Sequence, residues 1–135
     1  MARMGLNHCF VCGVNNPVGL HLDVEDGDGW AKANWTIEAP YVGYENILHG
    51  GIQAAILDDM MSHATYSMNV DALTVRLEMD YKAPAYVGET ITCEAYVEHY
   101  GGRKSIKTAG IIKRGDTVIS EAKGVLVIVN GSVSK

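Results

Sequence analysis

The segment from His49 to Asp59 has the residue types and spacing of a reactive site. A His-Gly-Gly sequence precedes an apolar stretch that ends in two adjacent carboxylates. The first backbone N–H groups of a helix have no acceptor within the helix and lie at the positive end of its dipole. Such groups can polarise a carbonyl oxygen, and Gly50 and Gly51 would let a substrate approach closely. The segment therefore combines backbone donors and an acid in one element.

The distance along this predicted helix limits how His49 and Asp58 can cooperate. Nine residues separate them, which in a helix is about 13 Å along the axis and about half a turn around it. The two side chains therefore cannot meet within one chain. If both act on one bond, a second copy of the chain must supply one of them, most simply through two antiparallel helices across a two-fold axis.

Asp58 and Asp59 occupy a helix that is apolar on nearly every side and should be buried. A desolvated carboxylate is unfavourable unless it is paired, hydrogen-bonded or functional. We interpret Asp58 as catalytic, because its spacing from His49 suits the composite site. We interpret Asp59 as a residue at the dimer seam that makes a structural bond or contacts the substrate.

Three further polar residues have two interpretations each. His49 is either a helix cap or a residue that orients the loop and contacts the substrate, and the glycines after it favour the second. Asn46 either holds a water or a polar substrate atom, or is a turn residue. Thr74 suits a strand by propensity alone. Its hydroxyl could position a water if that strand begins beside the partner's helix.

Cys9 and Cys12 have the CxxC spacing of half a zinc site or of a redox pair. His8 and His21 could complete a zinc site, but such sites usually show a second pair at similar spacing. A redox pair would open a helix, whereas Asn-Asn-Pro follows this one. The leading interpretation is a tight structural turn that needs no metal.

Arg103 and Lys104 follow two glycines at the end of a predicted strand. They either form part of a solvated surface or meet a phosphate at the edge of the sheet.

The composition bounds the class of protein. The 135 residues suit one domain, expected over 1–135, and 47% hydrophobic with 20% charged residues is ordinary for a soluble globular protein. No apolar run reaches the ~18 residues of a membrane span and no signal-peptide core is visible, so we expect a cytoplasmic protein without a membrane partner. The net charge of -5 argues against a nucleic-acid partner, and three cysteines argue against a secreted disulfide framework.

The elements that would position these residues form an α+β pattern. We expect an irregular cap segment at 1–19, a hairpin with strands at 20–24 and 29–37, a helix at 50–68 and a frayed tail at 130–135. Four extended segments, expected as an antiparallel meander, lie at 73–82, 90–100, 104–113 and 117–129. A helix too hydrophobic to face water is best covered by a curved sheet wrapped around it.

Three segments of the chain resemble the PaaI-like (phenylacetic acid degradation type) hot dog fold thioesterases. They are CFVCGVNNPVGLHL, GYENILHGGIQAAILDD and LTVRLEMDYKAPAYVGE, and together with the strand order they span nearly the whole chain. The resemblance implies a hot dog fold assembled as homodimers or dimers of dimers. It also implies acyl-coenzyme A thioesterase activity, with no metal or other cofactor.

The resemblance also implies roles for individual residues. Asp58 matches the acid that serves as general base or nucleophile, and Gly50 or Gly51 matches the amide that polarises the thioester carbonyl. His49 matches the loop histidine near the thioester, and Thr74 matches the Ser/Thr position that holds a water in relatives.

The substrate-binding residues follow less directly. Arg103 and Lys104 lie where relatives often meet the phosphates of coenzyme A. The role of Asn46 does not transfer, and the resemblance leaves the choice between Asp58 and Asp59 open. An acyl chain between two helices would be lined by Ile52, Ile56, Met60 and Met61.

Three other functions compete with the thioesterase. The first is a non-catalytic acyl-CoA-binding sensor on the same fold, which would bind without turnover. The second is a hydratase or dehydratase, which would need a His/carboxylate pair that His49 and Asp58 do not obviously supply. The third is a zinc-stabilised interaction module built on Cys9 and Cys12.

Overall fold

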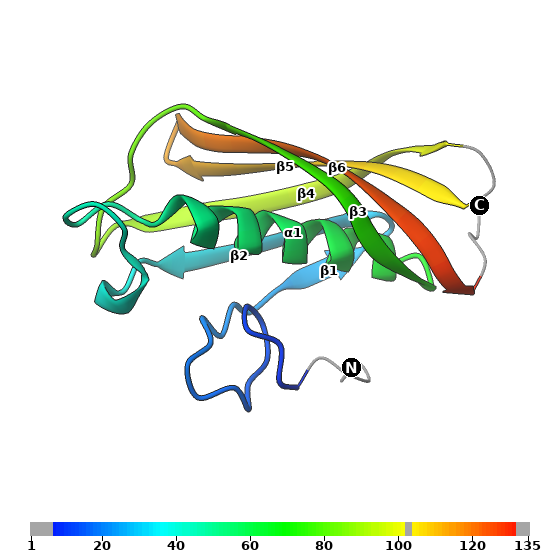
Figure 1. The fold of residues 1–135 in the computed structure, drawn as a ribbon, viewed down its shortest axis with the longest axis horizontal. Coiled ribbons are helices and arrows are strands. Elements are labelled where there is room, and N and C mark those ends of the chain that lie inside the picture. The colour runs from blue at the N-terminus through cyan, green and yellow to red at the C-terminus, as the bar shows by residue number, and fades with distance from the viewer. Residues whose placement is uncertain (1–6, 102–103, 132–135) are drawn as a thin grey trace.

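The computed structural model describes residues 7–101 and 104–131, in which one long helix packs against a curved antiparallel sheet (Figure 1). The helix is α1 (Gly50–Tyr66), preceded by a short 3-10 turn, η1 (Ala39–Tyr41). The strands are β1 (Glu25–Gly27), β2 (Trp30–Thr36), β3 (Val70–Tyr81), β4 (Thr90–Gly101), β5 (Ser105–Arg114) and β6 (Thr117–Gly131). The predicted α+β architecture is confirmed. Within these described ranges, no helix has both the length and the apolar composition needed to cross a bilayer.

The start and end of α1 have local causes. His49 caps the helix, because its ring Nδ1 accepts the N–H of Gly51 at 2.8 Å and so satisfies a donor that has no acceptor within the helix. The helix begins at Gly50, as predicted. It ends at Tyr66, two residues earlier than predicted, and Asn69 beyond it has the left-handed φ of 67° that often follows a helix.

The side of α1 that faces the sheet forms the centre of the core. Its largest fully buried side chains are Ile56, Leu57, Met60 and Met61. Met61 fits against β6 where Gly124 has no side chain, since a Cβ there would lie 3.0 Å from the Met61 sulfur. The hydroxyl of Thr108 also donates to that sulfur at 3.0 Å. Met61 therefore belongs to the chain's own core, and the prediction that it contacts an acyl chain between two helices does not fit this placement.

The first hairpin is displaced along the sequence from its predicted position. Asp28 and Gly29 have φ values of 51° and 87°, the positive pair that a two-residue hairpin turn requires. The strand before the turn is β1 rather than residues 20–24. Two N–H groups within residues 20–22 instead donate to the carbonyls of residues 10–11, both at 2.9 Å. Residues 20–22 thus pair with the irregular N-terminal segment instead of with a neighbouring strand.

The strand order of the sheet is β1-β2-β4-β5-β6-β3. Strands β4, β5 and β6 form the expected meander, but the prediction that β3 belongs to the meander is wrong. Between β2 and β3 the chain passes through α1, which carries it to the opposite edge of the sheet, where β3 pairs with β6 (Figure 1). Asn130 and Gly131, expected in the frayed tail, pair with β3, and residues 132–135 lie outside the described part of the chain.

Candidate active site

Asp58 and Thr74, both predicted as site residues, are in direct contact. The hydroxyl of Thr74 donates to Oδ1 of Asp58 at 2.6 Å, and both residues are half-buried. A carboxylate accepts through both of its oxygens, so Oδ2 keeps its capacity for a water or a substrate. The contact is made within one chain, whereas Thr74 was expected to act beside the helix of a partner.

The open side of α1 carries Asp58. Residues three or four apart share one side of a helix, and the partly or fully exposed residues at this spacing are Gly51, Ala55, Asp58 and Ser62. We call these four residues the open stripe. Asp58 therefore faces a surface that solvent or another molecule can reach.

A β-bulge in β3 brings Thr74 to this position. The pairing with β6 shifts between Thr74 and Arg76, so that Val75 is an extra residue on β3. Before the bulge the even-numbered residues of β3 are the less exposed ones, and after it the odd-numbered residues are. Thr74 and Leu77, three residues apart, can therefore both face inward, which a regular strand does not permit. The bulge lets Thr74 reach Asp58 while the rest of β3 covers the core.

The start of α1 offers one of the two backbone donors that were predicted. The N–H of Gly51 is occupied by the ring of His49, so the expected pair of oxyanion donors at Gly50 and Gly51 is not available in this arrangement. The N–H of Gly50 has no acceptor among the residues that the structure describes. One N–H group at the positive end of the helix dipole is thus left for a carbonyl oxygen.

A shallow pocket of about 210 Å³ adjoins this helix start. It is lined by Pro40, Tyr41, Val42, His49, Gly51 and Ile52. Of the residues predicted to bind substrate, Ile52 is the one that this pocket includes. Its half-buried, apolar side chain would suit an acyl group.

Asp59 points to a different side of α1 from Asp58. Its Oδ1 lies 3.4 Å from Cys9 Sγ and 3.6 Å from Cys12 Sγ, and its Oδ2 lies 3.5 Å from His63 Nε2. Burial raises the pKa of the Asp59 carboxyl. The predicted role for Asp59 at the substrate or the dimer seam does not fit a side chain enclosed by its own N-terminal segment.

Of the remaining predicted residues, Asn46 and Lys104 lie in loops. Asn46 is exposed, and its backbone carbonyl accepts the N–H of Val87 at 3.0 Å, which agrees with its interpretation as a turn residue. Lys104 is exposed immediately before β5. Arg103 lies outside the described residues.

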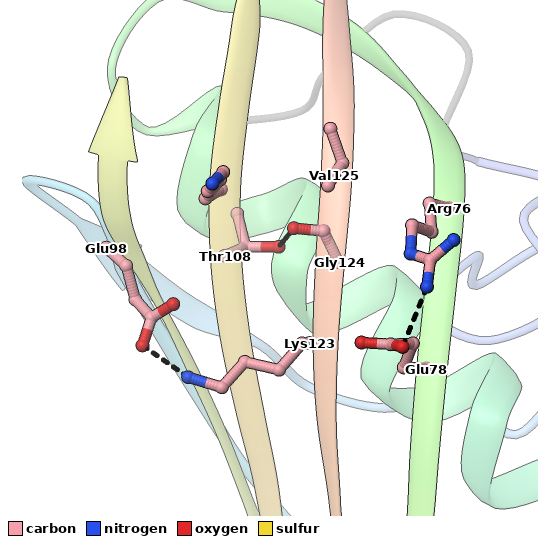
Figure 2. A pocket seen from close by; sticks show the side chains of 8 residues that line it. Arg76, Glu78, Glu98, Thr108, Lys123, Gly124 and Val125 are labelled. Atoms are coloured by element: carbon pink, nitrogen blue, oxygen red, sulfur yellow. Dashed lines mark hydrogen bonds and ion pairs between the residues drawn. The ribbon is translucent and has the colours of Figure 1, made fainter. Parts of the chain in front are cut away.

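A second hollow, of about 220 Å³, lies across the exposed side of strands β3 to β6 (Figure 2). Its cations include Arg76 and Lys123, which could in principle meet phosphates. However, Arg76 binds Glu78 at 2.8 Å and Lys123 binds Glu98 at 2.6 Å, as the dashed lines in Figure 2 show. Because carboxylates neutralise two of its three cations and leave Lys107 as the third, this hollow is a poorer candidate for an anion site.

Sequence reasoning missed His63 and Asp26. His63 is buried, its Nδ1 lies 2.9 Å from Asp26 Oδ2, and its Nε2 lies 3.4 Å from Cys12 Sγ. The usable signal was the i,i+4 spacing of Asp59 and His63 on the predicted helix. No local pattern pointed to Asp26, because it lies 37 residues before His63.

A long helix wrapped by an antiparallel sheet, with a reachable carboxylate on the helix, defines the class of this molecule as a hot dog fold protein. The sequence profile of the thioesterase superfamily matches residues 45–121, which is more than half of the chain. The chain belongs to that superfamily.

Individual relatives agree with this assignment. Over 116 residues the chain is 22% identical to the acyl-coenzyme A thioesterase PaaI of Escherichia coli K12, covering 85% of this chain and 83% of that protein. A crystal structure of a thioesterase superfamily protein matches with a TM-score of 0.81 and 28% identity, over 87% of this chain and 61% of that one. The prediction of a PaaI-like hot dog thioesterase is confirmed.

A further structural relative is a hypothetical thioesterase from Streptococcus pneumoniae TIGR4, solved with coenzyme A. It matches with a TM-score of 0.76 and 16% identity, over 84% of this chain and 88% of that one. Two other structures of the same protein carry alanine in place of an aspartate at position 52 and of a threonine at position 68 of that chain, sixteen residues apart.

Proposed function

We propose that this chain is an acyl-coenzyme A thioesterase, which hydrolyses the thioester of an acyl-CoA to a free acid and coenzyme A. Membership of the thioesterase superfamily and the similarity to PaaI support this activity. The observation that carries it is the hydrogen bond from Thr74 to Asp58 on the open stripe of α1. This bond orients a reachable carboxylate without occupying both of its oxygens.

In the proposed reaction, Oδ2 of Asp58 takes a proton from a water as the water oxygen adds to the thioester carbonyl carbon. The carbon–sulfur bond then breaks, and coenzyme A leaves as a thiolate that recovers the proton. Direct attack by the carboxylate would use the same oxygen: it breaks the carbon–sulfur bond and releases the coenzyme A thiolate, and water then opens the mixed anhydride and supplies the thiolate with its proton. Thr74 orients Asp58 in either case.

The spacing of the pair supports its assignment. Asp58 and Thr74 are sixteen residues apart, the same separation as the aspartate and threonine that were replaced in the Streptococcus pneumoniae thioesterase. We assign Asp58 as the base or nucleophile and Thr74 as the residue that positions it.

The complete site is proposed to need two protomers. The N–H of Gly50 from one chain would stabilise the oxyanion formed beside Asp58 of the other. Strand β3 supports such an assembly, because it is the last strand of the sheet and exposes Leu73 and Val75 by 63% and 62%. A homodimer, or a dimer of dimers, would cover this edge.

The substrate contacts are proposed to continue from the same residues. Ile52 would contact the acyl group, Asn46 a polar atom, and Lys104 with Arg103 the phosphates of coenzyme A. A cytoplasmic location is supported by the free state of Cys9, Cys12 and Cys93 among the described residues.

The test is thiol release from short, medium, long and aromatic acyl-CoAs. Wild type should turn over at least one class, and Asp58→Asn should lose about 10²-fold or more of the rate, because the amide cannot accept the proton. Asp59→Asn is the matched control and should retain turnover. Tight acyl-CoA binding without any turnover would overturn the proposal in favour of an acyl-CoA sensor. Full activity in Asp58→Asn would refute the assigned residue.

A further inference from the structure

Three potential metal ligands meet on the side of α1 next to the open stripe, and a fourth lies beside two of them. Ligand atoms of Cys9, Cys12 and Asp59 all lie within 4.8 Å of one another. His63 Nε2 lies 3.4 Å from Cys12 Sγ and 3.5 Å from Asp59 Oδ2. The proposed thioester chemistry uses none of these groups. We propose that Cys9, Cys12, Asp59 and His63 bind a structural zinc ion.

The donor set and its spacing suit zinc. Thiolate, imidazole and carboxylate are its protein ligands, with bonds of about 2.3 Å to sulfur and about 2.0–2.2 Å to nitrogen or oxygen. In a tetrahedron such bonds place neighbouring ligand atoms about 3.3–3.8 Å apart. The contacts of Asp59 Oδ1 with Cys9 Sγ and Cys12 Sγ, at 3.4 and 3.6 Å, and of His63 Nε2 with Cys12 Sγ, at 3.4 Å, fall in this range.

The CxxC turn is already shaped to hold thiolates. The N–H groups of Val11 and Cys12 donate to Cys9 Sγ at 3.4 and 3.5 Å and hold this sulfur in place. The N–H of Gly13 donates to the Cys9 carbonyl at 2.9 Å and closes the turn. A Cβ at Gly13 would lie 2.2 Å from the backbone nitrogen of Cys9, so a glycine is required there.

His63 is oriented as a metal ligand usually is. Its Nδ1 lies 2.9 Å from Asp26 Oδ2 in β1, which leaves Nε2 facing Cys12 and Asp59. A carboxylate on the far nitrogen fixes the ring of a ligating histidine and raises its basicity. His8 and His21 are the histidines that the sequence offers to complete a zinc site with Cys9 and Cys12. The Nε2 of His21 instead lies 2.6 Å from the Asn16 carbonyl, within its own segment.

Without a cation, the cluster leaves buried polar groups poorly matched. Asp59 Oδ2 is buried without a hydrogen bond, since His63 Nε2 at 3.5 Å is too distant for a good one. A divalent cation there would compensate for the desolvation of these polar groups, which otherwise destabilise a protein interior.

A site with four protein ligands has no open position for a substrate, so its role is structural. Cys9 and Cys12 belong to the irregular N-terminal segment, while Asp59 and His63 belong to α1. The ion would therefore fasten a segment that has no regular structure of its own to the central helix.

The first test is metal content. Protein prepared without chelators, or metal-free protein reloaded with zinc, should contain about one zinc per chain by elemental analysis. Cobalt(II) in its place should give a thiolate charge-transfer band and the intense visible bands of tetrahedral coordination. Cys12→Ser and His63→Gln should abolish or strongly weaken binding. Cys93→Ala and His21→Gln are the matched controls and should bind as wild type does.

Two results would overturn the proposal. One is wild-type protein that takes up no zinc at micromolar concentrations. The other is a folded Cys12→Ser or His63→Gln protein that binds cobalt with an unchanged spectrum. If Cys12→Ser does not fold, His63→Gln decides, because it leaves the CxxC turn intact.

Asp26 is proposed as a positioning residue. Asp26→Asn should lower zinc affinity about 10- to 100-fold in competition with a chelator, while the cobalt spectrum keeps its tetrahedral form. Asp28→Asn, an exposed neighbour in the hairpin turn, is the control and should bind zinc as wild type does. Equal zinc affinities for the two variants would remove Asp26 from the site.

Discussion

Two adjacent carboxylates on α1 occupy opposite kinds of environment. Asp58 lies on the open stripe and is held by one hydroxyl, that of Thr74. Asp59 has a side chain only 10% exposed and lies against Cys9, Cys12 and His63. Successive residues of a helix point about 100° apart, so neighbours in sequence can serve separate sites.

The difference shows what each kind of acid requires. A carboxylate that acts on a substrate must be reached by it, and Asp58 keeps one oxygen available at a surface. A carboxylate enclosed among sulfur and nitrogen ligands needs a compensating cation, as the proposed zinc would be. If the two sides of α1 are independent, a change on the Asp59 side should alter stability, and a change on the Asp58 side should alter turnover.

Metal removal is expected to have the largest effect. A ligand present at 100 to 1,000 times its Kd stabilises the folded state by about 3–4 kcal/mol, so chelation should lower the unfolding temperature by about 10 °C. Turnover at 25 °C should persist. Differential scanning fluorimetry and thiol release measure the two quantities, and Cys12→Ser should show no chelator-dependent shift. Loss of turnover in chelated protein that remains folded would show that the two sides are coupled.

The Thr74 hydroxyl should affect turnover without affecting metal content. Thr74→Val keeps the shape of the side chain but removes the bond to Asp58. The expected loss is about tenfold in kcat, equivalent to about 1.4 kcal/mol for a hydrogen bond to a charged group. Thr74→Ser should retain most of the activity, because it keeps the donor. A Thr74→Val protein with wild-type kcat would mean that Asp58 needs no orienting partner.

Cys93 has a buried thiol that lies on neither of these two sides of α1. Burial raises the pKa of its thiol from 9.0 to about 12. The native state therefore binds this proton more tightly than the unfolded state, and the free energy of unfolding should fall as the pH rises from 9 to 12. The loss at pH 10 should be about 1.4 kcal/mol. Chemical denaturation of wild type and Cys93→Ala between pH 9 and 12 measures this loss. If the free energy of unfolding falls equally with pH in the two proteins, the assignment to Cys93 is wrong.

Substitution of His49 should have the smallest effect on stability and turnover, because His49 caps the start of α1 and contributes to neither of its two sides. His49→Ala removes the cap on the Gly51 N–H and should cost about 1 kcal/mol of stability. His49→Asn can still cap the helix and should restore most of that stability. Denaturant titrations compare the two variants. A stable His49→Asn protein with strongly reduced turnover would place His49 in the reaction as well.

The parts of the fold that follow local rules could be predicted from the sequence. The helix start follows from the His-Gly-Gly sequence, and its apolar character on nearly every side required a sheet wrapped around it. The extended segments were placed within a few residues of β3 to β6. The neighbours of β3 could not be read in this way, because the crossover through α1 decides which edge of the sheet it joins.

The candidate site was harder to predict, because its contacts depend on single irregularities. The bulge after Thr74 reverses which side chains of β3 face inward, and a strict period of two does not anticipate it. The sequence offers His8 and His21, which are close to Cys9 and Cys12 along the chain, to complete a zinc site. The structure supplies His63, 51 residues away from Cys12, because α1 passes over the N-terminal segment.

The sequence separation between the two cysteines and α1 sets the order in which they are made during protein synthesis. Cys9 and Cys12 precede Asp59 and His63 by about fifty residues, which a ribosome adds in about 3 to 10 seconds. During that interval the two thiols are in the nascent chain without the helix that they will contact. The N-terminal segment is thus translated first but can reach its native position only after α1 has formed. Early damage to those thiols, by oxidation for example, would remove the contacts of Cys9 and Cys12 with α1 before the helix exists.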